Sequence, residues 1–476
     1  MPPPGAVVIG QVTSAVSLDP HLHDEESTHS ALSHFYERLV AFGPELELQP
    51  ELATAWASPS DTVWRFTLRG GVRFHDSAPC EAPDVVASLQ RALRLPGSQV
   101  AHYLQNVVEV RAAGPLTVEV VTSAPSPLLL NKLAFVAIVP RSTPMAPITR
   151  PVGTGPYQFV SGAARGILEG RAFDGYWGPR PAFTAFRVVP LPDAPGRARA
   201  VVERRADVVV RFPFEFTPWA RGQKGMRLAS RPGLGVGLLC FSGRKGSRFA
   251  DRRVREAFAL AIDRSRLVDE VERPFTALAE QFVPRSVFGY APPARSWRHD
   301  PAGARALLAE AGFPSGLEVT LVTPDTQASL GQRLALLLAE AGIRVRLEAP
   351  PWDAFYARWS SGGLELFSFA YNCGTGDASD LLDSFFRTRG PSAGTLNSSG
   401  YSNERFDRLV EEAGRVLDPE TRRRLMGEAL ALLREDLPAI PLLSRGYLYA
   451  VGDEVAWTPR MDRRARAQDM RPRDAS

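Results

Sequence analysis

Cysteine, lysine and long apolar runs are scarce in this chain of 476 residues. Three cysteines, Cys80, Cys240 and Cys373, lie far apart. An odd number without C-x-x-C spacing excludes a disulfide framework and a zinc site of known spacing. We expect buried free thiols, and one disulfide stays open as an alternative in an oxidising compartment. No apolar run approaches the ~18 residues of a membrane span, and the N-terminal MPPPGAVVIGQV has neither the basic region nor the long apolar stretch of a signal peptide.

Charge is nearly balanced and catalytic motifs are missing. The net charge of +4 is small for this length and argues for neither nucleic acid nor a polyanionic surface as partner. Nearly all the basic residues are arginine, spread along the whole chain. The sequence contains no G-x-S-x-G, no H-E-x-x-H and no P-loop lysine, so we expect no enzyme. The length favours two or three domains.

What the chain does contain is a sharp motif between Val63 and Leu93. Trp64 to Arg69 alternates apolar and polar residues and predicts a strand. Gly70-Gly71 predicts a tight turn, and Val72 to His75 a second strand of the same hairpin. A helix follows, with Pro83 at its entry. The segment WRFTLRGGVRFHDSAP resembles the signature sequence of family 5 extracytoplasmic solute-binding proteins, although Ser77 replaces the usual glycine.

Further motifs of the same family follow in the right order. PVGTGPYQF at residues 151–159 resembles its P-V-G-T-G-P-Y pattern, in which we expect the glycines to permit positive φ. FADRRVREA at 249–257 and AIDR at 261–264 resemble its F-x-D-x-R-V-R-x-A and A-I-D-R patterns. The resemblance covers about residues 7 to 462, nearly the whole chain.

Periodicity predicts the other elements. We expect strands over residues 6–12, 117–121, 135–139 and 367–371, and helices over 27–42, 125–133 and 419–433. Two α/β repeats, with helices 302–311 and 330–341 ended by glycine and strands 317–322 and 343–347, predict a mixed, partly parallel sheet. The charged tail beyond Arg463 predicts a frayed end.

The resemblance implies an α/β, two-lobe fold of the periplasmic-binding-protein type II kind, with an inserted subdomain and two hinge crossings. Lobe one would comprise residues 1–36, 151–238 and 442–476, and the inserted subdomain residues 37–150. Lobe two would comprise residues 239–441. The crossings would lie near 236–242 and 437–447.

The implied function is that of a substrate-binding protein of an ABC importer. It would capture a peptide-like or other small polar solute between its lobes and deliver it to the membrane permease. We expect a monomer outside the cytoplasm, with no cofactor and no nucleic acid. Two alternatives stay open: uptake of nickel or a metal chelate, and a cytoplasmic ligand sensor that uses the same fold.

Candidate ligand contacts follow the strand predicted over 367–371. In peptide-binding relatives this strand end carries a tryptophan and, three residues later, an aspartate that pairs with the peptide α-amino group. The resemblance places Tyr371 and Gly374 at those positions, with Asn372 between them. Asp377 could substitute for the missing carboxylate or could cap the next helix, and for Asp380 we favour capping.

The remaining candidates come from three other segments. Asn397 and Tyr401 lie in a match to the family's N-x-x-G-Y-x-N, His21 in a match to its L-D-P-H, and Phe241 in a strand that resembles its L-x-F-N. Four histidines also share one stretch: His21, His23, His29 and His34. Imidazole suits nickel, but His29 and His34 are five apart and share no helical face, so we expect solvated histidines rather than a metal site.

Overall fold

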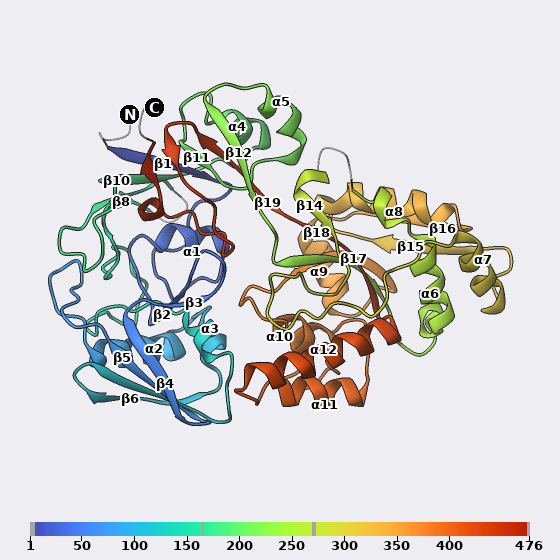
Figure 1. The fold of residues 1–476 in the computed structure, drawn as a ribbon, viewed down its shortest axis with the longest axis horizontal. Helices are drawn as coiled ribbons and strands as arrows, with labels where there is room; N and C mark the ends of the chain where they lie inside the picture. Colours follow the sequence, from blue (N-terminus) through green and yellow to red (C-terminus); the bar gives the residue numbers. More distant parts are fainter. Residues whose placement is uncertain (1–4, 164–165, 269–272, 474–476) are drawn as a thin grey trace. The chain divides into compact units, whose positions relative to one another are not determined.

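The computed structural model describes residues 5–163, 166–268 and 273–473, which divide into two compact units (Figure 1). Unit 1 comprises Met1–Arg231 and Tyr447–Ser476, and unit 2 comprises Pro232–Gly446. The chain therefore passes twice from one unit to the other. Each unit combines a mixed sheet with helices, so the α/β prediction is confirmed. The finer boundaries after residues 36, 150, 238 and 441 stay predictions.

Unit 1 is built on a seven-stranded sheet in the order β12-β19-β11-β1-β10-β9-β8. The strands are β1 (Ala6–Gln11), β8 (Tyr157–Gly162), β9 (Leu168–Ala172), β10 (Ala185–Pro190), β11 (Val208–Val209), β12 (Met226–Arg231) and β19 (Tyr447–Gly452). The predicted first strand is confirmed as β1, which runs parallel to β10 and β11 at the middle of the sheet. Its continuous apolar run suits a strand covered on both faces.

A four-stranded antiparallel sheet, β4-β5-β7-β6, forms another part of unit 1. Its strands are β4 (Ala53–Ser60), β5 (Val63–Leu68), β6 (Val107–Gly114) and β7 (Thr117–Thr122). Helix α2 (Ala82–Arg94) packs on β6 and β7. It begins with a capping box, in which Glu81 and Asp84 each accept a hydrogen bond from the other's backbone N–H, and Pro83 lies in its first turn.

The hairpin predicted across Gly70-Gly71 is wrong in its second strand. β5 pairs with β4 on one side and β7 on the other, so no edge of it is left for residues 72–75. Those residues instead fold back on themselves: Phe74 N–H donates to Ala78 O and Cys80 N–H to Val72 O. Ser77 lies in this loop with a φ of 72°, which is the left-handed conformation that suits the glycine usual there.

The helix predicted over residues 27–42 is also wrong in length. Helix α1 ends at Leu32 (Glu26–Leu32), and residues 40–42 form β2 (Val40–Phe42), paired with β3 (Leu48–Pro50). The carbonyls of His34 and Phe35 accept hydrogen bonds from Tyr157 and Gly155 N–H. Tertiary bonds have therefore replaced the helical ones.

The same crossing explains the two glycines of the P-V-G-T-G motif. Neither Gly153 nor Gly155 has positive φ, so that prediction is wrong. A Cβ on Gly153 would lie 2.1 Å from Phe35 O, and one on Gly155 would lie 2.7 Å from His34 O. Close approach of two backbones, rather than turn conformation, requires glycine here.

Two other predictions fail in unit 1. Residues 136–139 are buried, but residues 135–139 form only an isolated bridge, Arg38↔Ala137, rather than a strand. The tail is not frayed in the described range, because Ala465, Ala467 and Met470 are buried against α1 and its surroundings. Ala465 N–H donates to Ser30 Oγ and Ala467 N–H to His34 Nε2. The short helix predicted over 125–133 is α3 (Leu129–Leu133).

Unit 2 is built on a six-stranded mixed sheet in the order β14-β18-β13-β17-β15-β16, which confirms the predicted sheet. Its strands are β13 (Gly235–Phe241), β14 (Thr276–Leu278), β15 (Leu317–Val322), β16 (Ile343–Glu348), β17 (Leu366–Asn372) and β18 (Ala439–Arg445). Its longer helices are α6 (Arg252–Ala261), α7 (Pro301–Glu310), α8 (Ala328–Ala339), α9 (Trp352–Ser360), α11 (Glu404–Ala413) and α12 (Pro419–Asp436). Helices α7 and α8 stop before Gly312 and Gly342, whose φ values are 95° and 80°.

Candidate ligand-binding site

The end of β17 carries the first three candidates. Tyr371 is half-buried: its hydroxyl donates to Asp380 O at 2.8 Å and lies 2.8 Å from Ser384 Oγ. Burial, reinforced by the nearby Asp380 charge, raises the pKa of Tyr371, so the phenol stays neutral. Asn372 is exposed at the last position of the strand. The tyrosine ring is thus held in one orientation beside an exposed asparagine.

Asp377 does not face solvent in the loop that follows. It is 2% exposed, and its carboxylate lies 3.0 Å from the guanidinium of Arg422 on α12. Its other oxygen accepts from Ser379 N–H at 2.9 Å. Asp380 likewise accepts from Thr375 N–H at 2.9 Å. Both carboxylates therefore bind backbone N–H groups around the loop. The capping expected of Asp380 is wrong, because Asp380 lies inside α10 (Ser379–Leu381) and accepts from a loop N–H rather than from a helix N–H. Asp377, which precedes α10 and accepts from Ser379 N–H, fits the capping alternative better.

Gly374, between these residues, leaves space. A Cβ built on it would meet no atom within 4 Å, and its φ is not in the left-handed region. A larger side chain would therefore fit at this position without strain.

Asn397 and Tyr401 lie together in one turn of unit 2. The Asn397 amide donates to Arg387 O and Tyr401 O at 2.9 and 2.8 Å, and its oxygen accepts from Ser399 and Gly400. The Tyr401 hydroxyl donates to Asp436 at 2.7 Å. Burial, followed by this hydrogen bond, raises the pKa of Tyr401. The Asn397 hydrogen bonds hold the turn that precedes α11.

Phe241 and His21 lie in separate cores. Phe241 is 1% exposed and packs with Phe249 and Phe258 in unit 2. His21 is fully buried in unit 1, where its Nε2 lies 2.9 Å from Ala137 O and its Nδ1 2.9 Å from Arg91 Nη1. Burial lowers the pKa of His21 to about 4, so the ring is neutral.

The expectation of solvated histidines is wrong. His23, His29 and His34 are all buried alongside His21, and burial lowers the pKa of His23 to about 2 and that of His34 to about 4. Within the ranges that the structure describes, no group of three or more His, Cys, Asp or Glu side chains is arranged to hold a metal ion. The three cysteines are free and buried.

A polar cluster in unit 1 was missed from the sequence. Asp24 accepts hydrogen bonds from His29 Nε2 and Tyr103 Oη, both at 2.9 Å, and His102 lies 3.6 Å away. Burial raises the pKa of Asp24, but the hydrogen bond and charge of His29 outweigh it and leave the pKa lowered. These residues come from two segments far apart in the sequence, so their spacing could not have predicted that they are in contact.

Known proteins of similar sequence and structure agree with this build. The chain is 27% identical to a glutathione-binding protein, GsiB, of Salmonella paratyphi A, over 92% of this chain and 88% of that protein. Its fold matches HbpA2 from Haemophilus parasuis with a TM-score of 0.87, at 22% identity and over 98% and 100% of the two chains. It also matches the periplasmic binding protein DppA from Helicobacter pylori in complex with the peptide STSA, with a TM-score of 0.80, at 24% identity and over 98% of each chain.

Two α/β units linked by two chain crossings are thus the fold of the periplasmic binding proteins. The family profile of the bacterial extracellular solute-binding proteins, family 5, matches residues 47–393. The chain belongs to this family of substrate-binding proteins, which act outside the cytoplasm and serve ABC importers.

Proposed function

We propose that this protein binds a short peptide, or a small polar solute built like one, and delivers it chemically unchanged to the permease of an ABC importer. It would act outside the cytoplasm as a monomer, with no catalytic step and no nucleic acid. No helix in the described ranges has the length and apolar character that a bilayer-spanning helix needs.

The observation that carries this proposal is the end of β17. There a neutral tyrosine is fixed by two hydrogen-bond partners, an exposed amide follows it, and open space lies beside Gly374. A fixed aromatic ring with adjacent amide groups can stack on a ligand while pairing with its peptide groups, at little cost in lost side-chain freedom. Tyr371 and Asn372 are therefore the ligand contacts we propose first. The other candidates would contribute indirectly, by holding the surrounding structure in place: His21, Phe241, Asp377, Asn397 and Tyr401.

Glutathione and peptides are favoured as the transported solute because a relative matched over 92% of the chain is a glutathione-binding protein and one matched structure holds a peptide. A thermal-shift screen tests this choice with glutathione, di- to pentapeptides, opines, oligosaccharides and nickel chelates. A ligand at a hundred times its dissociation constant should add ~2.7 kcal/mol to stability. Stabilisation by glutathione or a peptide supports the proposal. A response to sugars or nickel chelates alone would overturn the ligand class.

A further inference from the structure

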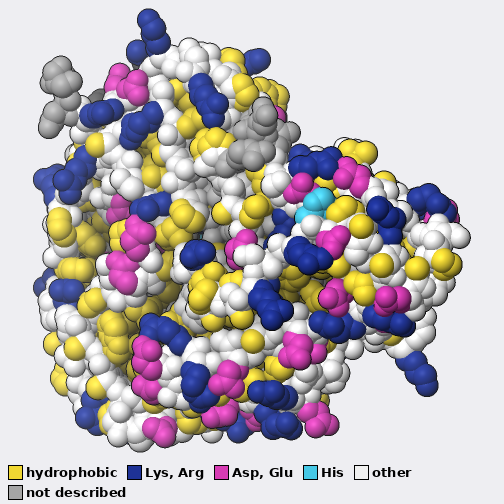
Figure 2. Space-filling view, turned by 45° about the vertical axis from the view of Figure 1, so that its right-hand side comes forward, with side chains coloured by type: hydrophobic (Ala, Val, Ile, Leu, Met, Phe, Trp, Pro, Cys, Tyr) yellow, Lys and Arg dark blue, Asp and Glu magenta, His cyan; other side chains and the backbone are white. Residues whose placement is uncertain are grey.

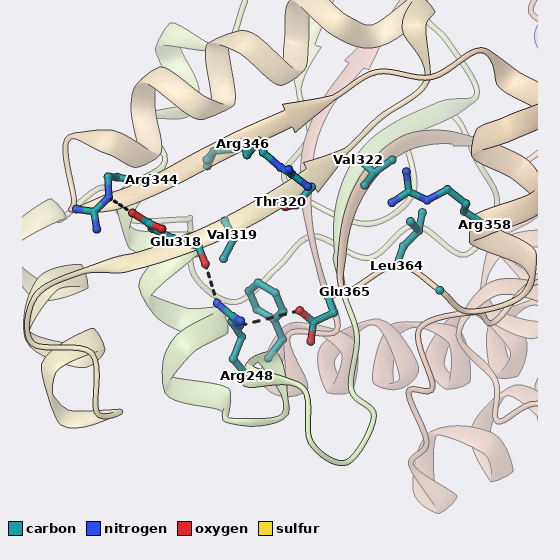
Figure 3. Close-up of a pocket in the computed structure, with 13 residues that line it drawn as sticks. Arg248, Glu318, Val319, Thr320, Val322, Arg344, Arg346, Arg358, Leu364 and Glu365 are labelled. Atoms are coloured by element: carbon teal, nitrogen blue, oxygen red, sulfur yellow. Dashed lines mark hydrogen bonds and ion pairs between the residues drawn. The ribbon is translucent and has the colours of Figure 1, made fainter.

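A cavity of about 670 Å³ lies in unit 2, where two neighbouring strands part (Figure 3). β15 pairs with β16 along all six of its residues, but with β17 only at Val322↔Phe367. Before that pair the two chains diverge. Glu318 and Thr320 line one side of the cavity, and Leu364 and Glu365, which precede and lead into β17, line the other.

The inner surface of this cavity is partly apolar. Val319, Val322, Leu364 and Phe249 contribute to its lining, and all four are largely buried in the core behind it. Carbon surface of this kind favours the hydrocarbon part of a ligand. The volume falls in the range of small-molecule sites, about 300 to 1,000 Å³.

The lining also carries an excess of positive charge. Its charged side chains are four arginines and two glutamates: Arg248, Arg344, Arg346, Arg358, Glu318 and Glu365. Arg344 is paired with Glu318 at 2.7 Å, and Arg346 and Arg358 share Glu348 at 2.7 and 2.8 Å. With Glu348 included, four guanidinium groups meet three carboxylates.

Arg248 is the least neutralised of the four. Its nearest carboxylate, Glu365, lies 4.0 Å away, beyond hydrogen-bond distance, and Nη1 donates to Glu318 O at 2.7 Å. Guanidinium groups offer several N–H donors each and bind carboxylate or phosphate in pairs of hydrogen bonds. The donors not used by Glu348 and Glu318 are therefore suited to an anionic group of a ligand.

We propose that this cavity is a second ligand site, for a small organic anion that joins a carboxylate or phosphate to a short hydrocarbon part. It is separate from the contacts proposed for the transported solute. Those lie at the far end of β17, a strand of seven residues, so the two ends are ~20 Å apart at about 3.3 Å per residue.

Methyl NMR of the full chain, labelled at leucine and valine, tests this site with hexanoate as the probe. Hexanoate should shift the methyl signals of Val319, Val322 and Leu364. Hexanol and hexylamine, which have the same chain but no negative charge, should leave them in place. The double variant Arg248→Gln/Arg346→Gln, which removes the least neutralised arginine and one of the pair that share Glu348, should bind hexanoate roughly tenfold more weakly or worse, the loss typical of one charged hydrogen bond. Arg424→Gln, which removes an exposed, ion-paired arginine on α12, should bind as the unaltered chain does.

Three outcomes would overturn the proposal. The first is that hexanoate leaves these three methyl groups unshifted, or shifts only methyl groups elsewhere. The second is that hexanol shifts them as much as hexanoate. The third is that the double variant binds hexanoate as tightly as Arg424→Gln does. Because the readout is local to the cavity, none of these outcomes depends on whether the protein transports a peptide.

Discussion

At the scale of single residues, the acidic side chains that follow β17 form hydrogen bonds and an ion pair within unit 2. Asp377 is paired with Arg422, and Asp380 accepts from Thr375. Gly374 is the position that leaves room, since a Cβ there meets nothing within 4 Å. Packing therefore does not require glycine at this position.

Gly374→Asp should strengthen binding of peptides with a free α-amino group. The added carboxylate would form a partly exposed ion pair with the ligand ammonium, which is worth about 0.5–1 kcal/mol, or a few-fold in affinity. Calorimetric titration of one tripeptide and its N-acetylated form measures this, with Gly374→Asn as the uncharged control. Equal gains for both peptides, or a gain with the asparagine, would contradict the explanation.

Ser77→Gly should stabilise the protein by ~0.5–1 kcal/mol. Ser77 has a φ of 72°, which a side chain disfavours and glycine adopts freely. Ser142, which is exposed and has no positive φ, supplies the matched control: Ser142→Gly should destabilise, because glycine there adds freedom to the unfolded chain and relieves no strain. Urea denaturation compares the two variants. A loss of stability in Ser77→Gly would show that the positive φ of Ser77 is not a source of strain.

At the scale of elements, local pattern sufficed where an element's own apolar face decides its structure. β1, α2, β7 and the pair of α/β repeats around β15 and β16 follow their periodicity. The local pattern failed where backbone groups from distant parts of the chain compete for the same hydrogen-bond partners. α1 stops at Leu32 because residues 153–157 take the next carbonyls, and residues 72–75 leave the hairpin because β4 and β7 already flank β5.

The candidate site shows the same limit. The motif located Tyr371 and Asn372 on a strand end, but it could not show that Asp377 meets Arg422, 45 residues away on α12. The cluster around Asp24 and the arginine-lined cavity likewise join segments far apart in sequence. On the face shown in Figure 2, basic and acidic side chains are interspersed, which agrees with the small net charge.

Asp377→Asn should destabilise unit 2 by ~3 kcal/mol, because it takes the carboxylate away from the buried Arg422 charge. The double variant Asp377→Asn/Arg422→Met should recover part of this loss, since the uncompensated charge is gone. Asp383→Asn, which removes a more exposed partner of Arg387, should cost little. Denaturant unfolding measures all three. If Asp377→Asn lowers the free energy of unfolding no more than Asp383→Asn does, the ion pair with α12 does not hold the loop.

At the scale of the whole molecule, the two units should respond differently to acid. Burial lowers the pKa of His21, His34 and His75 to about 4 and that of His23 to about 2, all in unit 1. In the unfolded chain these groups titrate near 6.5. The folded state disfavours their protonation, so their contribution to stability is complete above pH 6.5. It is lost as pH falls from 6.5 toward 4, and for His23 further toward 2. At pH 5 each group accounts for a loss of at most ~2 kcal/mol.

Hydrogen exchange measured by mass spectrometry at pH 7 and pH 5, corrected for the intrinsic rates, tests this difference. Peptides from unit 1 should lose protection at pH 5. Unit 2, whose sequence holds the one remaining histidine outside unit 1, His299, should keep its protection. An equal loss in both units would show that the buried histidines are not the cause.

The central claim, that the chain is a substrate-binding protein whose β17 end contacts the solute, is tested most directly by calorimetric titration of the ligand found in the screen. Tyr371→Ala should weaken binding roughly tenfold or more, as expected for loss of an aromatic anchor. Tyr356→Ala, which removes an exposed tyrosine on α9, should bind like the unaltered protein. If both variants bind equally well, β17 does not contact the solute. If no solute of any class binds, the proposed role is wrong.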